Sequence, residues 1–363
     1  MRRRPAGEAQ GRRCPIAAFL TTFLAGLGGG LLFRKLKVPG GMMVGSIVLV
    51  AALSICTGGA LMPRAAKTAA QSLAGAFIAC GMDWSDFKSF SKLLRPAAVL
   101  LSSVLLLNLL LGVLIWLCGP MDLLTALLCA VPGGMSDTPV IAADLGADAP
   151  KVAVLQFVRM ASGIGLFPSL IAFMTRGEPE EENAPPPAPR PDGERSAADA
   201  AVTVAAALLC GVLGGRLGVP AGTLIFSMFG VIGLKIIAGR SYLPLWLKRL
   251  AQVLSGAYIG CGITRADLLE LRYLILPAII ILAGYFANSV LTGRRLRRLF
   301  GFPLKTAMLA ATPAGASDMA LISADIGVNS RELVELQVIR MVVVVSLFPQ
   351  IIVWVASGFA SMI

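Results

Sequence analysis

Long runs of apolar residues alternate with short polar stretches along the whole chain, and several of these runs are long enough to cross a bilayer. The longest span residues 16–33, 96–117, 152–174, 274–291 and 334–355, whereas the hydrocarbon core of a membrane requires about 20 helical residues. Lipid cannot satisfy exposed backbone groups, so such runs form helices. The pattern therefore predicts an all-α, polytopic integral membrane protein.

The same order of motifs occurs twice, 181 residues apart. Pro132 matches Pro313 (313 − 132 = 181), and no gap is needed between the first matching pair and the last. Self-similarity at one fixed offset indicates two homologous membrane repeats. Further pairs at this offset are Val38–Val219, Pro39–Pro220, Gly75–Gly256, Cys80–Cys261, Asp137–Asp318, Asp144–Asp325, Gln156–Gln337, Arg159–Arg340 and Phe167–Phe348.

The duplication predicts four regions along the chain. Residues 1–15 form a basic flank that we expect to be retained as an anchor, 16–174 the first repeat, 175–199 a polar, proline-rich and disordered linker, and 200–363 the second repeat. Each repeat has six apolar segments, which gives about ten to twelve transmembrane helices in all. In the first repeat they are 16–33, 40–57, 66–82, 96–117, 122–145 and 152–174.

The fifth segment of each repeat is interrupted by helix-breaking residues. If this segment crosses the membrane, the two repeats are parallel; if it is a re-entrant hairpin, they are inverted. With every segment crossing, about 18 loop Lys and Arg fall inside and about 11 outside under the positive-inside rule, which favours parallel repeats. The interrupting residues are Pro132, Gly133, Gly134, Pro313 and Gly315.

Each break is followed by a serine and an aspartate, Ser136-Asp137 in the first repeat and Ser317-Asp318 in the second. A break frees backbone groups that lipid cannot satisfy, so it must face protein or a water-filled cavity. Serine and aspartate are good N-cap residues for the half-helix that follows. A pseudo-two-fold axis would bring the two half-helix ends together at one binding site.

Further polar residues follow each break at helical spacing. A second acid stands seven residues on, and the next helix carries a glutamine and an arginine three residues apart, on one helix side. Charges inside a membrane are costly and usually pair or line a functional path. A structural alternative is that Arg159 forms a buried ion pair with Asp144 or Asp137. The residues concerned are Asp144, Gln156 and Arg159, with their counterparts Asp325, Gln337 and Arg340.

The composition excludes several functional classes. The 32 Lys and Arg against 20 Asp and Glu give +12, but most of these charges lie in short loops between spans, so no nucleic acid is expected. The chain contains no histidine, and its seven cysteines form no CxxC pair. A copper or non-haem iron oxygenase requires imidazole ligands. We therefore expect no metal, no cofactor and no enzymatic activity.

These motifs together resemble the AbrB family of membrane proteins, which carries an AbrB duplication. The resemblance rests on two Val-Pro-(Gly/Ala)-Gly turns, two Pro-x-Gly-x-Ser-Asp breaks, two Asp-(Leu/Ile)-Gly helix ends and two Leu-Gln-x-x-Arg helices. It implies a multi-pass protein of the inner (plasma) membrane. Members are described as regulators of gene expression, and some carry an older label of ammonia monooxygenase, which the absence of histidine disfavours.

Two functions follow as expectations. The first is a small-solute transporter or sensor, in which Ser136, Asp137, Ser317 and Asp318 bind a solute or ion, while Arg159 and its counterpart balance charge or meet an anionic group. The alternative is a non-transporting regulatory membrane protein that engages a cytoplasmic partner through loops such as 294–298, with a purely structural polar network. Apart from such a partner, the expected partners are the lipid bilayer and a small solute or ion.

Overall fold

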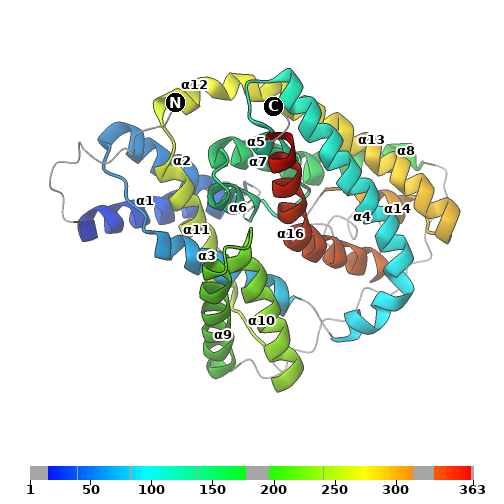
Figure 1. Ribbon diagram of the computed structural model, residues 1–363, viewed down its shortest axis with the longest axis horizontal. Helices are drawn as coiled ribbons and strands as arrows, with labels where there is room; N and C mark the ends of the chain where they lie inside the picture. Colours follow the sequence, from blue (N-terminus) through cyan, green and yellow to red (C-terminus); the bar gives the residue numbers. More distant parts are fainter. Residues whose placement is uncertain are drawn as a thin grey trace.

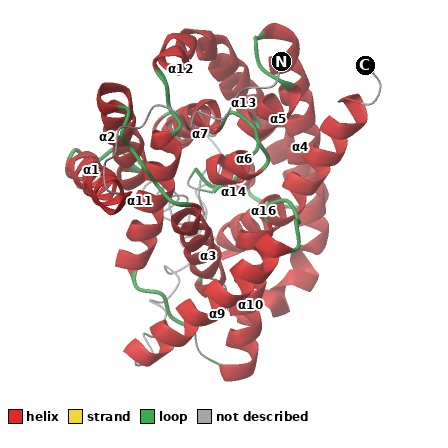
Figure 2. Cartoon of the chain, turned by 60° about the vertical axis from the view of Figure 1, so that its left-hand side comes forward, coloured by secondary structure: helices red, strands yellow, loops and turns green. Residues whose placement is uncertain are grey.

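The computed structural model describes residues 15–38, 40–81, 84–135, 137–176, 196–239, 241–313 and 331–360. Within these ranges all regular structure is helical, which confirms the predicted all-α class (Figure 2). The basic flank and the linker fall almost wholly outside the described residues. So do five predicted site or break residues, Ser136, Gly315, Ser317, Asp318 and Asp325.

The helix bounds follow the 181-residue offset. Both α2 and α3 begin and end 181 residues before α10 and α11, which supports our interpretation as a duplication. The first half contains α1 (Pro15–Lys35), α2 (Gly41–Thr57), α3 (Arg64–Cys80), α4 (Trp84–Cys118), α5 (Leu123–Cys129), α6 (Thr138–Asp144), α7 (Ala149–Gly165) and α8 (Phe167–Met174). The second contains α9 (Ala197–Arg216), α10 (Gly222–Ala238), α11 (Leu245–Cys261), α12 (Arg265–Glu270), the 3-10 helix η1 (Leu271–Leu274), α13 (Ile275–Phe300), α14 (Leu304–Ala311) and α16 (Arg331–Ala360).

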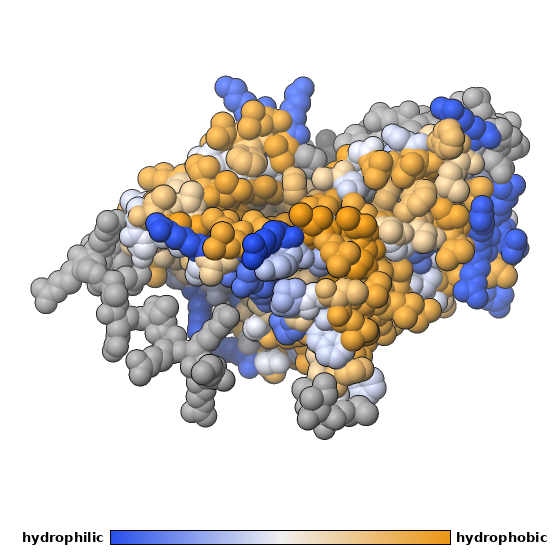
Figure 3. Space-filling view, turned by 90° about the horizontal axis from the view of Figure 1, so that it is seen from above, coloured by the Kyte–Doolittle hydropathy of each residue, from blue (hydrophilic) through white to orange (hydrophobic). Residues whose placement is uncertain are grey.

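Six helical stretches of the described chain are long and apolar enough to cross a membrane. Both α2 and α10 are apolar but shorter, with 17 residues each. Large apolar side chains such as Leu110 and Trp354 are exposed at 60% and 76%, and apolar residues cover much of the face seen in Figure 3. Such a surface suits lipid rather than water. The described chain is therefore that of a membrane protein.

The helices form two bundles, each drawn from both halves (Figure 1). Bundle 1 contains α1–α3 and α9–α11, with α2 packed on α11 and α10 packed on α3. Bundle 2 contains α4, α5, α7, α8, α13, α14 and α16, with α4 packed along α13. The short helix α6 packs on α5 and α7 and so belongs to bundle 2, and it also contacts α11 of bundle 1, so it lies at the seam between the bundles.

Corresponding helices of the two halves run antiparallel in bundle 1. The Lys67 ammonium lies over the Tyr258 ring at 5.1 Å, and the Lys248 ammonium lies over the Phe77 ring at 4.0 Å. At the 181-residue offset Lys67 corresponds to Lys248, and Phe77 to Tyr258. The amino-terminal part of α3 thus lies beside the carboxyl-terminal part of α11, and the reverse also holds.

The same antiparallel relation holds in bundle 2. The Thr292 hydroxyl of α13 donates to the Ser103 hydroxyl of α4 at 3.0 Å. The corresponding pair, Gly284 and Leu111, is also in close contact. Repeats related by an axis along the membrane normal would place their corresponding helices parallel. The antiparallel pairs α3–α11 and α4–α13 therefore support inverted repeats and go against the preference for parallel repeats drawn from loop charges.

The fifth segment of the first half is a re-entrant hairpin. Its first helix, α5, begins after Asp122, whose carboxylate accepts a hydrogen bond from the Thr125 N–H at 2.9 Å. The chain comes back to this point after α6, where the Asp148 N–H donates to the Thr125 hydroxyl at 3.0 Å. Because the segment enters and leaves at one level, it adds no crossing. Of the two alternatives that the sequence left open for this segment, the structure of the first half has the re-entrant one.

Candidate functional site

The first helix break is held by two buried side chains of α7. The Gln156 amide donates to the carbonyl oxygens of Leu128 and Val131 at 3.2 and 2.9 Å, and the Arg159 guanidinium donates to those of Val131 and Gly133 at 3.1 and 2.5 Å. These carbonyls are the groups that the break frees, and lipid could not satisfy them. The break therefore faces protein, as predicted. Arg159 binds backbone, so the alternative of an ion pair with Asp144 or Asp137 was wrong.

The second half repeats this arrangement as far as it is described. The Gln337 amide donates to the carbonyl oxygens of Leu309 and Ala310 at 3.0 and 3.3 Å. The Arg340 guanidinium donates to those of Ala310 and Thr312 at 3.4 and 2.5 Å. The Gln-x-x-Arg spacing thus places an amide and a guanidinium on the end of the preceding half-helix in both repeats.

Tyr285 of α13 joins the two breaks. Its buried hydroxyl donates to the Ala130 carbonyl oxygen at 2.7 Å and interacts electrostatically with Arg159. Its electrostatic interactions extend to Arg340, and the two arginines are close enough to act on each other. Both arginines, of which only 3% and 4% of the residue surface is exposed, therefore lie in one buried centre of bundle 2.

Asp137 lies at the N-cap position of α6, but its side chain makes no capping hydrogen bond. Its carboxylate lies so close to Gly134 that a Cβ there would come within 2.3 Å of it. The charged group that acts on Asp137 is Lys248 of α11. The expected N-cap role is therefore met in position only, and Asp137 lies within electrostatic reach of α11 across the seam.

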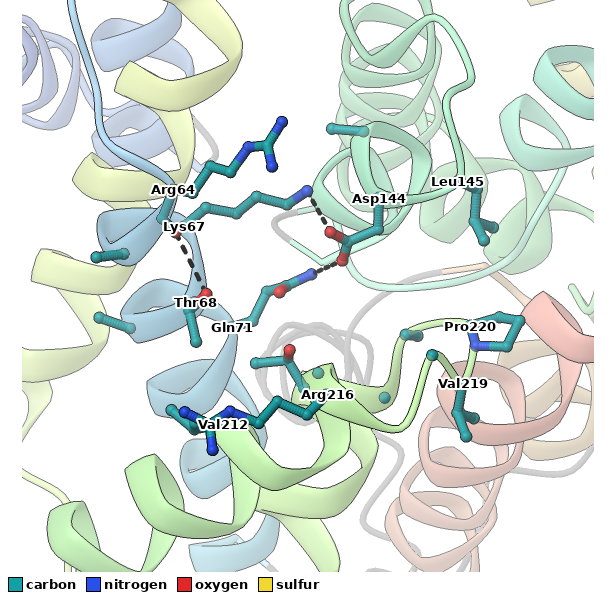
Figure 4. A pocket seen from close by; sticks show the side chains of 18 of the residues that line it. Arg64, Lys67, Thr68, Gln71, Asp144, Leu145, Val212, Arg216, Val219 and Pro220 are labelled. Carbon is teal, nitrogen blue, oxygen red and sulfur yellow. Dashed lines mark hydrogen bonds and ion pairs between the residues drawn. The ribbon is translucent and has the colours of Figure 1, made fainter.

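Asp144, at the carboxyl-terminal end of α6, forms polar contacts that cross the seam (Figure 4). Its carboxylate forms an ion pair with the Lys67 ammonium and accepts a hydrogen bond from the Gln71 amide. Lys67 and Gln71 lie four residues apart, on one side of α3. Both are buried, with 7% and 3% of their surface exposed. Two side chains of bundle 1 therefore bind the Asp144 carboxylate of bundle 2.

A cavity of about 790 Å³ opens beside this ion pair. Its walls come from α3, from the end of α6, from the α9–α10 turn and from α11, so it lies between the two bundles (Figure 4). Cavities of this size admit small metabolites. Its polar lining residues include Arg64, Lys67, Thr68, Gln71, Asp144, Arg216, Thr223 and Tyr258.

The α9–α10 turn that lines the pocket is held in an uncommon conformation. Ala221 has φ of 56°, and its counterpart Gly40 has φ of 63°. The left-handed region costs a residue with a side chain about 1–2 kcal/mol relative to glycine. The Gln350 amide of α16 donates to the Pro220 carbonyl oxygen at 2.7 Å and fixes this turn. Bundle 2 therefore helps to hold the pocket wall that bundle 1 provides.

The sequence analysis did not predict four residues of the pocket, namely Gln71 and the basic residues Arg64, Lys67 and Arg216. A signal for two of these residues was present, because Lys67 and Gln71 recur as a lysine and a glutamine at the 181-residue offset. A lysine and a glutamine four residues apart in both copies of a short membrane helix indicate a buried polar stripe. Arg64 and Arg216 have no arginine at the matching positions of the other repeat. Only the fold brings these two arginines to one cavity.

The family model of the transition state regulatory protein AbrB matches residues 3–175 and 55–356. The chain belongs to the AbrB family. It is 26% identical over 277 residues to "Uncharacterized protein YhjN" of Bacillus subtilis (strain 168), covering 69% of this chain and 68% of that protein. It is 25% identical over 319 residues to "Putative regulator AbrB" of Escherichia coli (strain K12), covering 85% and 88%. The family expectation drawn from the motifs is thus confirmed.

Proposed function

We propose that this AbrB-family protein is an inner-membrane transporter or sensor that binds a small solute in the pocket between its two bundles. The observation that carries the proposal is the ion pair of the buried Lys67 with Asp144 beside a cavity of about 790 Å³. A buried charge in a membrane protein is expensive and commonly marks a substrate path. Neither the family description nor the relatives' names point to an enzyme, and we propose none.

The arrangement of the halves supports transport. Inverted repeats with broken helices recur in transporters, where one bundle rocks against the other around a fixed site. Asp144 belongs to the hairpin of bundle 2, whereas Lys67 and Gln71 belong to bundle 1. A relative movement of the bundles would therefore separate Asp144 from its partners. The same movement would open or close the pocket.

The predicted break residues take separate roles in this proposal. Arg159, Arg340 and their glutamines hold the breaks, and so position the hairpins rather than bind solute. Asp137, within electrostatic reach of α11, is proposed to tune the charge of the seam together with Lys248. By the repeat relation, Ser136, Ser317, Asp318 and Asp325 are proposed to line the same path. Each of these roles rests on the duplication.

A thermal-shift screen of the purified full-length protein tests the proposal. The panel contains neutral amino acids, sugars, choline, mono- and dicarboxylates and inorganic phosphate. A solute that binds the folded state raises the melting temperature with its concentration. We expect at least one to do so saturably, with a weaker effect on a Gln71→Leu variant than on Gln252→Leu, the matching change in the second repeat. The absence of any saturable shift across the panel would contradict the proposal.

The name of the Escherichia coli relative favours a second candidate, a regulator without transport. Its partner would engage the exposed basic end of α13, where Arg294, Arg295, Arg297 and Arg298 lie. Hydrophilic side chains gather at the right-hand edge of the view in Figure 3, on the side where α13 ends in Figure 1. This candidate predicts that charge reversal at 294–298 abolishes function, while pocket variants retain it.

A further inference from the structure

The described lining of the seam pocket carries more positive than negative charge. Three basic residues, Arg64, Lys67 and Arg216, face one carboxylate, Asp144. We infer that the ligand is a small soluble organic anion with a carboxylate or phosphate group, which competes with Asp144 for Lys67. This inference rests on the proposed function and names the class of solute that the pocket takes.

Lys67 is the buried member of the site. Only 9% of its side chain is exposed, whereas 32% of the Asp144 side chain is exposed. A buried ammonium requires a counter-charge, because removal of its partner leaves an uncompensated charge at high cost. Asp144 supplies that charge in the state described, but it comes from the other bundle. An anion arriving through the pocket can replace it without leaving Lys67 unpaired.

Arg64 and Arg216 provide charge that the described fold does not use. Both are exposed, and neither forms an ion pair with any carboxylate in the described ranges. They come from different elements, the first residue of α3 and the last of α9, yet line one cavity. A guanidinium binds carboxylate or phosphate oxygens through two parallel N–H bonds. The two arginines therefore suit the mouth of an anion site.

Neutral donors complete the site. The Gln71 amide donates to Asp144 in the described state, and would be free to donate to an anion once Asp144 withdraws. Three hydroxyl-bearing residues, Thr68, Thr223 and Tyr258, line the same cavity. Donors and cations dominate the described polar lining, which favours an anion over a cation or a sugar. Lipid phosphate offers the same chemistry, so the test separates it from a soluble anion.

Thermal melting of the full-length protein in a neutral detergent tests the inference. Succinate and inorganic phosphate are titrated against sodium chloride at matched ionic strength, with choline chloride as the cation control and phosphatidylglycerol as the lipid arm. We expect succinate or phosphate to stabilise the wild type saturably. Arg64→Gln should raise the apparent Kd roughly tenfold, the size of one charge-assisted hydrogen bond. Arg294→Gln, an equally exposed arginine outside the pocket, should leave it unchanged.

Substitutions of the two members of the ion pair are expected to change the anion affinity in opposite directions. Lys67→Gln should abolish the anion response, whereas Asp144→Asn should lower the apparent Kd, because it removes the competing carboxylate. A merely structural ion pair would destabilise both variants and alter the anion response of neither. If these two variants do not fold, the comparison of Arg64→Gln with Arg294→Gln decides whether the anion binds in the pocket.

Failure of the anion inference and failure of the proposed function would give different results. Stabilisation by choline or a neutral solute without any by the anions would overturn the anion inference and leave the proposed function standing. Stabilisation by phosphatidylglycerol alone would assign the pocket to a lipid headgroup and overturn the soluble ligand. An equal response of Arg64→Gln and Arg294→Gln to the anions would show that the anion does not bind in the pocket. If no solute of the wider panel raised the melting temperature saturably, the proposed function itself would be contradicted.

Discussion

Replacing Arg159 with leucine is expected to destabilise the protein by about 3 kcal/mol, the cost of leaving buried polar groups without a partner. The guanidinium satisfies the Gly133 carbonyl oxygen, for which no other donor is found in the described chain. The Val131 carbonyl oxygen keeps the Gln156 amide at 2.9 Å. The hairpin tip would therefore lose its only tie to α7 at Gly133.

Thermal unfolding of purified protein in detergent measures this effect. Arg176→Leu serves as control, because Arg176 is an exposed arginine whose guanidinium lies over the Phe173 ring at 5.0 Å. We expect the control to melt within a degree or two of the wild type, and Arg159→Leu to melt far earlier. Equal melting of both variants would show that Arg159 does not hold the break.

Substituting Gly29 with alanine is expected to destabilise the α1–α2 pair by about 2–3 kcal/mol through overpacking. An added Cβ would lie 2.2 Å from the Gly45 carbonyl oxygen and 2.9 Å from the Leu49 Cβ. The obstacle is backbone, which cannot rotate away as a side chain can. The two helices must move apart, and small residues at such crossings are the basis of close packing in membranes.

The neighbouring glycine provides a matched control. A Cβ on Gly28 would meet no atom within 4 Å, and alanine is favoured over glycine inside a helix by about 0.5–1 kcal/mol. Gly28→Ala is therefore expected to be neutral or slightly stabilising, although it changes the same helix by the same methyl group. Comparable melting temperatures for the two alanine variants would refute the close crossing of α1 and α2.

Much of the fold could be predicted from the pattern of residues. The apolar runs gave the helices, and the 181-residue offset anticipated paired bounds such as those of α2 and α10. The direction of the hairpin could not be predicted, because proline and glycine mark a break without stating which way the chain turns. That turn depends on the Thr125–Asp148 contact between residues 23 apart. Loop charges were too few to decide it.

The site could be predicted only in part. Gln156 and Arg159 were identified from spacing, but their partners are backbone carbonyls, which leave no trace in the sequence. Asp144 was identified, whereas its partner Lys67 lies 77 residues earlier, on a helix that the sequence presents only as short and rich in small residues. The pocket forms where α3 meets the hairpin, and this meeting is a property of tertiary packing.

Labelling of a cysteine in the pocket shows directly whether water and a solute reach the seam between the bundles. In a variant whose native cysteines are replaced by serine, Thr68→Cys places one thiol in the half-buried pocket lining. Leu110→Cys, on the exposed apolar surface of α4, is the control. Right-side-out and inverted vesicles are treated with a membrane-impermeant maleimide, with and without each solute that raises the melting temperature.

We expect the Thr68→Cys variant to be labelled from at least one side of the membrane, and the stabilising solute to slow this labelling. The Leu110→Cys variant should stay unlabelled. Labelling of the Thr68→Cys variant from neither side, or at a rate that no solute changes, would contradict a solute site at the seam between the bundles.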